Sequence, residues 1–99
     1  MNHEIDEMQQ RFVNEFGELT ELFDIISLYR MYRFYCLEKI KTSNNLLDLR
    51  LSLMMENVVN QANKCFKISK VDFINRFHKW NIINNPGEYS EKQIKQLSA

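Results

Sequence analysis

Hydrophobic residues recur at steps of three and four along most of this chain, which is the spacing of one face of an α-helix. The first such stripe runs from Ile5 to Phe16 and is followed by Gly17. This glycine either separates two helices or bends one long helix, and the sequence leaves both open. A second helix is predicted over about residues 19–40. Its segment 25–37 is apolar around almost its whole circumference, so we expect other helices to surround it.

Polar residues that cap helices mark the third helix. The string Thr-Ser-Asn-Asn at 42–45 predicts a loop and an N-cap, because these side chains accept hydrogen bonds from free amides at a helix start. The apolar residues of the helix that follows are Leu46, Leu47, Leu49, Leu51, Leu53, Met54, Met55, Val58, Val59, Ala62, Cys65 and Phe66. Its continuous stripe, which we expect to face the core, consists of Leu47, Leu51, Met54, Val58, Ala62 and Cys65.

A second set of caps divides the rest of the chain. Ser69 with Asp72 resembles a capping box and predicts a fourth helix that ends near Trp80. Residues 81–89 contain the only proline, so we predict a loop whose Ile82 and Ile83 pack back on the core. Another capping box, from residue 90, predicts a short last helix up to residue 97.

No segment alternates with a period of two, so no strand is expected. The sequence therefore predicts a single all-α domain over residues 1–99, a small helical bundle of four to five helices. The helix at about residues 19–40 is expected to lie buried at the centre of this bundle. Residues from about 69 to 97 are expected to form a C-terminal helix-loop-helix.

Composition narrows the class of protein. The longest uncharged window, 25–29, is far shorter than the roughly 20 residues that cross a bilayer, so no membrane partner is expected. The start of the chain is acidic and polar, unlike a secretory signal, which predicts a cytoplasmic protein. Cys36 and Cys65 lie in apolar segments and are predicted to be two buried thiols. The formal net charge is zero, yet residues 1–25 hold seven acids and one base.

The residues give little sign of catalysis. His3 and His78 have no partner at the spacing of metal ligands, so we predict no metal, no cofactor, no catalytic residue and no small-molecule substrate. Residues 14–22, Asn-Glu-Phe-Gly-Glu-Leu-Thr-Glu-Leu, resemble the first half of the motif in all-α nucleotide pyrophosphohydrolases of the MazG type. The resemblance implies magnesium-binding carboxylates at Glu15, Glu18 and Glu21. In the nearest match to the second half, Glu56 to Asn60, the second acid is missing.

The aromatic run in the second helix is the main candidate for association. A helix that is apolar on all sides in a chain of 99 residues has few neighbours to cover it, so part of its surface is expected to meet a second copy or another protein. Bases interleave with aromatics there, and large aromatics with Arg are typical anchors of interfaces. The predicted partner-binding residues are Tyr29, Arg30, Tyr32, Arg33 and Tyr35.

A nucleic-acid partner is the alternative. The C-terminal region carries four bases that would contact phosphates, namely Arg76, Lys79, Lys92 and Lys95. Its pattern of Phe73, Phe77 and Trp80 is similar to the C-terminal helical module of viral and phage primase-helicases, although the chain has no Walker motif.

These patterns favour a non-enzymatic regulatory protein that binds another protein, as a regulator, inhibitor, immunity protein or chaperone does, and that forms a homodimer. Abundant Asn, Ile and Lys are typical of the AT-rich genomes of phages and mobile elements. DNA binding through the C-terminal bases is the second hypothesis, and a MazG-like hydrolase is the third.

Overall fold

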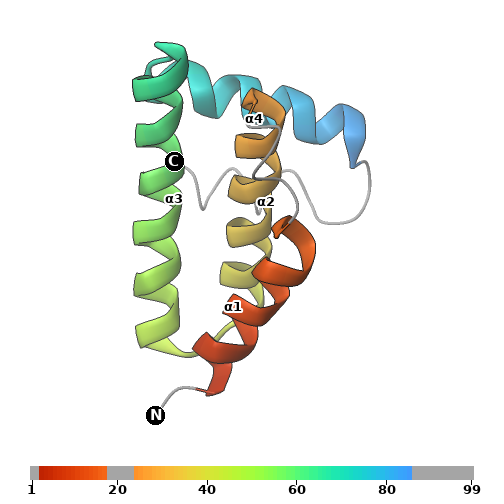
Figure 1. Cartoon of the computed structure of the whole chain (residues 1–99), viewed down its shortest axis with the longest axis vertical. Coiled ribbons are helices and arrows are strands. Elements are labelled where there is room, and N and C mark those ends of the chain that lie inside the picture. Colours follow the sequence, from red (N-terminus) through yellow and green to blue (C-terminus); the bar gives the residue numbers. More distant parts are fainter. Residues whose placement is uncertain (1–2, 18–23, 86–99) are drawn as a thin grey trace.

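The computed structural model describes residues 3–17 and 24–85, which form four helices and no strand. They are α1 (His3–Phe16), α2 (Ile25–Lys41), α3 (Asn45–Phe66) and α4 (Lys70–Asn84). Figure 1 shows α1, α2 and α3 running alternately up and down side by side, while α4 crosses them at one end. The prediction of a small all-α bundle is confirmed.

The second helix begins later than the sequence pattern predicts. Asp24 has an extended backbone, with φ −133° and ψ 179°, so no helix passes through it. Its carboxylate accepts a hydrogen bond of 2.9 Å from the backbone N–H of Ser27, and this bond, above all, lowers the pKa of Asp24. Asp24 is therefore the N-cap of α2. Because α1 ends at Phe16, α1 and α2 are two helices, and residues 18–23 lie outside the described part of the chain.

The start of α3 is capped as predicted. The side-chain oxygen of Asn44 accepts hydrogen bonds from the backbone N–H groups of Leu46, at 3.0 Å, and Leu47, at 3.1 Å. These are two of the amides that a helix start leaves without a partner in the helix. Four members of the predicted stripe are buried and Met54 is partly buried.

Cys65, the last member of that stripe, is exposed, so its predicted burial is wrong. The stripe identifies the side of α3 that faces the core, but not how far the neighbouring helix extends along it. With 22 residues against 17, α3 is about 7 Å longer than α2. Cys65 lies in the last turn of α3.

The turn into α4 and the end of α4 also differ from expectation. Ser69 caps α4 as predicted, accepting from the backbone N–H of Asp72 at 3.2 Å. However, α4 continues past Trp80 to Asn84, and Ile82 and Ile83 are exposed on it, so a loop that packs back from residue 81 is wrong. Pro86 restricts mainly the residue before it, and the helix has room to continue up to that point. The predicted last helix lies outside the described residues.

Aromatic rings join α2 to α1 and to α4 in the core. Tyr32 on α2 meets Phe73 and Phe77 of α4, with ring centroids 5.5 and 4.8 Å apart. On another side of α2, Phe34 lies 5.6 Å from both Phe12 and Phe16 of α1. The predicted burial of this helix is confirmed over most of its length.

Replacing Asn44 with alanine should lower the free energy of unfolding by about 1 kcal/mol, because two amides at the start of α3 lose their acceptor. Denaturant unfolding followed by circular dichroism measures the change. Ser43→Ala, next to the cap and exposed, is the matched control and should stay within about 0.5 kcal/mol of the wild type. Equal losses in the two variants would contradict a specific role for the cap.

Candidate functional site

The three tyrosines predicted to bind a partner lie inside the molecule. Tyr29, Tyr32 and Tyr35 are 6%, 3% and 7% exposed, and burial raises the pKa of Tyr29 and Tyr35. Their rings contact rings of α1 and α4. Their role in binding a partner stays a prediction, but in this fold they offer a partner little surface.

The two arginines of the same run lie at the edge of the core, and both are partly buried. The guanidinium carbon of Arg30 is 5.6 Å from the centre of the Phe16 ring, a distance typical of a cation–π contact. Such stacking uses the face of the guanidinium, so its N–H groups can still donate sideways.

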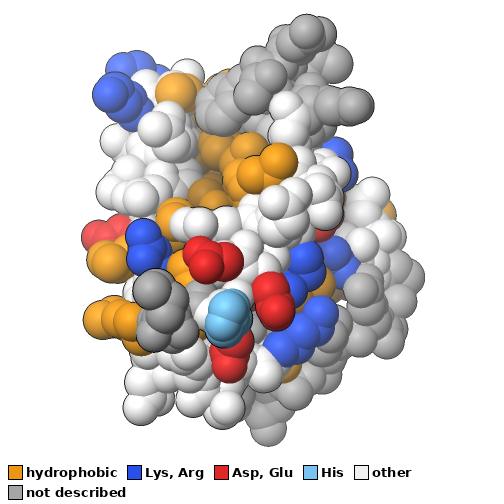
Figure 2. All heavy atoms as spheres, turned by 60° about the horizontal axis from the view of Figure 1, so that its bottom comes forward, with side chains coloured by type: hydrophobic (Ala, Val, Ile, Leu, Met, Phe, Trp, Pro, Cys, Tyr) orange, Lys and Arg blue, Asp and Glu red, His pale blue; other side chains and the backbone are white. Residues whose placement is uncertain are grey.

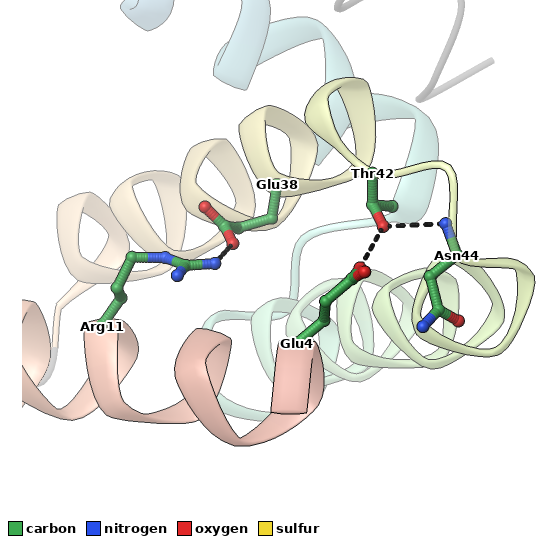
Figure 3. Close-up of polar contacts among 5 residues, drawn as sticks. All are labelled: Glu4, Arg11, Glu38, Thr42 and Asn44. Atoms are coloured by element: carbon green, nitrogen blue, oxygen red, sulfur yellow. Dashed lines mark hydrogen bonds and ion pairs between the residues drawn. The ribbon is translucent and has the colours of Figure 1, made fainter. Parts of the chain in front are cut away.

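Polar contacts join α1 to α2 (Figure 3). Arg11 forms an ion pair with Glu38, whose side chain is buried, and this hydrogen bond is the main cause of the raised pKa of Arg11. Nearer the start of α1, the Thr42 hydroxyl donates to Glu4 at 3.2 Å and accepts from the backbone N–H of Asn44 at 3.1 Å. These contacts fix the position of α1 along α2.

Two hollows lie along this seam, and we call them together the basic groove. The larger, of about 530 Å³, runs between α1 and α2. The smaller, of about 250 Å³, lies where α1 and α2 meet the end of α4. Both are lined by Glu15 and Arg33, so they are neighbours. The other charged or amide residues and the indole that line the groove are Arg11, Asn14, Arg30, Glu38, Lys41, Trp80, Asn84 and Asn85.

The outer face of α3 carries a row of exposed leucines, which we call the leucine stripe. Leu46, Leu49 and Leu53 are 54%, 60% and 55% exposed and follow one another at steps of three and four residues. Hydrophobic side chains stand out at the left edge of Figure 2, the side of α3 in both views. The three leucines belong to the apolar set predicted for the third helix but not to its continuous stripe, and their spacing of three and four residues is the signal that marks this second face.

Neither cysteine sits in a catalytic arrangement. Burial raises the pKa of Cys36 to about 12, so its thiol stays protonated and is a poor nucleophile. Cys65 is exposed, and its S–H donates to Gln61 at 3.4 Å. The ring of His78 lies against Phe77, with centroids 5.4 Å apart. Among residues 3–17 and 24–85, no group of three or more His, Cys, Asp or Glu side chains is placed to hold a metal ion.

Only part of the two alternative sites is described. Of the three MazG-like acids, Glu15 is exposed at the end of α1, while Glu18 and Glu21 lie outside the described residues. Of the four bases predicted to bind nucleic acid, Arg76 and Lys79 are exposed on α4, and Lys92 and Lys95 lie in the part that is not described. None of the helices described here is long and apolar enough to span a bilayer.

Comparison of the chain with models of known protein families finds no match, and comparisons with curated proteins and with solved structures find none either. The resemblances to MazG-type hydrolases and to primase-helicases therefore gain no support from relatives.

The two cysteines should differ sharply in reactivity. At neutral pH a water-soluble thiol reagent should modify Cys65 quickly in the folded protein, because its sulfur is exposed, and should modify Cys36 only when the core opens. Mass spectrometry of the modified protein over time measures both rates. The Cys65→Ser variant is the control and should gain no label until denaturant is added. Rapid labelling of that variant would contradict the burial of Cys36.

Proposed function

We propose that this chain is a non-enzymatic interaction protein that acts by binding proteins, and that the leucine stripe is its contact surface. The observation that supports the proposal is the row of three leucines, each more than half exposed, on the side of α3 opposite its buried residues. Contiguous exposed apolar patches on small proteins are typical of interaction sites, whereas single exposed hydrophobic residues are ordinary.

The leucine stripe differs from the other exposed hydrophobic residues of the described chain. Val13 on α1, Ile26 on α2 and Val71 on α4 are single residues, and Ile82 and Ile83 are neighbours in sequence that point about 100° apart on a helix. The three leucines instead form a line about 10 Å long along one helix face. Such a line is the usual contact surface of one helix with another.

A second copy of the chain is the partner we propose first. The formal net charge is zero, so two copies do not repel each other as whole molecules. Exposed Arg50 and Glu56 lie beside the leucines and would form the polar rim of the contact. In a parallel pair, Arg50 and Glu56 of one copy would each lie level with the same residue of the other copy. An antiparallel pair separates these like charges, so we propose antiparallel packing of the two α3 helices about a twofold axis.

The other candidate chemistry has less support. A hydrolase needs a nucleophile, a base or a metal-bound water in reach of a substrate. The described cysteines and histidines do not form such a group: Cys36 is buried, Cys65 contacts a glutamine, His78 contacts a phenylalanine, and His3 is exposed at the start of α1. A regulatory protein needs only a surface that another protein recognises, and the leucine stripe is one.

Light scattering at several concentrations should give twice the mass of one 12.0 kDa chain for the wild type. Leu49→Lys should raise the dissociation constant of the dimer at least about tenfold, because a charge would be buried at the centre of the contact. The helical signal in circular dichroism should not change, since Leu49 is exposed in one copy.

Val13→Lys is the matched control, because Val13 is exposed to a similar extent but stands alone on α1. It should leave the dimer intact. A wild type that stays monomeric at high concentration, or equal weakening by the two lysine variants, would contradict self-association through α3.

A further inference from the structure

Charge is unevenly distributed along the described part of this chain, although the formal net charge is zero. Of the nine acids in residues 3–17 and 24–85, eight lie between Glu4 and Glu56, and Asp72 alone follows them. Five bases lie in the same last stretch, namely Lys64, Lys67, Lys70, Arg76 and Lys79. All five are exposed, at the end of α3 and along α4, and we call them together the α4 surface.

Acids nearby do not cancel this charge. None of the five bases forms an ion pair with another described residue. Asp72 lies on α4 itself, and Glu56 lines a small hollow between α3 and α4 together with Lys70. When both acids are counted against the five bases, three positive charges remain. A surface with this excess attracts a polyanion and speeds its approach.

Two of the lysines occupy positions that do not favour lysine locally. The end of a helix favours a cation, but Lys67 has a left-handed backbone, with φ 58°, where glycine is the usual residue. Lys70 opens α4, and the start of a helix carries a partial positive charge that repels a cation. Both side chains are exposed, so packing does not explain them. Their common property is a positive charge at the corner between α3 and α4.

The outward side of α4 presents polar side chains along one line. Asp72, Arg76 and Lys79 follow one another at steps of four and three residues, and exposed Asn75 lies beside them. The opposite side of this helix packs in the core. Figure 1 shows α4 crossing the bundle at one end. Its 15 residues make a rod about 22 Å long, and the major groove of DNA is wide enough to admit a helix.

The extent of the α4 surface favours a polymer of phosphates over other anions. Lys70 and Lys79 are nine residues apart, or about 14 Å along the helix, which is farther than a single phosphate reaches. A membrane surface would need an apolar stripe beside the bases, but Val71 lies at one end of α4 and Ile82 and Ile83 lie at the other. Double-stranded RNA has a major groove too deep and narrow for side chains to read.

We infer that the α4 surface binds double-stranded DNA, with the outward side of α4 in the major groove and the lysines of the corner against backbone phosphates. Arg and Asn recognise base edges in this groove, while Lys contacts to phosphates position a protein on the duplex. The inference is independent of the leucine stripe, whose last residue, Leu53, lies eleven residues before Lys64, or about 16 Å along α3.

A fluorescein-labelled DNA duplex of about 20 base pairs, followed by anisotropy, tests this inference. Three to five phosphate contacts predict that the affinity falls roughly 40- to 500-fold between about 50 and 200 mM salt. Lys79→Glu should weaken binding at least about tenfold at the lower salt concentration, because it replaces an attraction to phosphate with a repulsion. Circular dichroism should show the wild-type helical signal, since Lys79 is exposed.

Lys41→Glu is the matched control. It makes the same change of charge at an exposed position at the other end of the bundle (Figure 1), where salt screens it from α4, and it should weaken binding less than about threefold.

Lys67→Gly separates charge from stability. It removes one positive charge and relieves the left-handed backbone. The variant should bind the duplex at least about threefold more weakly and lower the slope of the salt dependence by about one. It should nevertheless unfold at no lower denaturant concentration than the wild type.

Salt-dependent binding of the duplex, with loss in Lys79→Glu and little change in Lys41→Glu, would support the DNA-binding surface. The inference is overturned if the duplex does not bind at about 50 mM salt, if the two glutamate variants weaken binding equally, or if a single strand of the same length binds more tightly. It is also overturned if polyglutamate displaces the labelled duplex as well as unlabelled duplex does, or if anionic vesicles bind more tightly, because an acidic protein or a membrane would then be the better partner.

Discussion

The rest of this structure depends on the burial of α2 by rings from two directions. Phe73 and Phe77 of α4 are wholly buried against Tyr29 and Tyr32 on one side of α2, and rings of α1 cover Phe34 and Tyr35 on another. The third neighbour, α3, contributes mostly aliphatic side chains. Since rings bring large apolar areas and prefer tilted or edge-on contacts, a few of them contribute strongly to how the other helices pack on α2. Helix α2 is the element that organises the molecule.

Because the rings of α2 pack inside the molecule, its outer surface is formed by other residues. The aromatic residues of α2 pack within the chain, whereas Arg30, Arg33 and Lys41 line the hollows at its seam with α1. The row of three exposed leucines lies on α3, whose opposite face packs against the core. In Figure 2 a group of Lys and Arg side chains lies at the lower right, while others lie at the left, where hydrophobic side chains are also exposed.

Local signals in the sequence predicted most of the fold. Asn44 and Ser69 are caps because their side chains accept from nearby amides, which depends only on close neighbours. The exposure of Cys65 depends instead on the relative lengths of α2 and α3, and the basic groove combines Glu15, Arg30 and Trp80 from three helices. Neither is encoded in any short segment. Helical periodicity shows which side of a helix is apolar, but a helix with two apolar sides, such as α3, has only one of them buried.

The left-handed backbone of Lys67, with φ 58° and ψ 34°, ends α3 and sets the direction of α4. A residue with a Cβ atom adopts this conformation at a cost of about 1 kcal/mol, and glycine usually takes this place at the end of a helix. Hydrogen bonds within the turn offset this cost: the backbone N–H groups of Lys67 and Ile68 donate to the oxygens of Asn63, at 3.0 Å, and Ala62, at 3.4 Å. The side chain of Asn63 also donates to the oxygen of Ile68 at 3.3 Å, and Ile68 is buried. The corner between α3 and α4 is therefore stabilised locally as well as by the burial of Phe73 and Phe77, so an isolated α3–α4 hairpin would keep part of the reason for its angle.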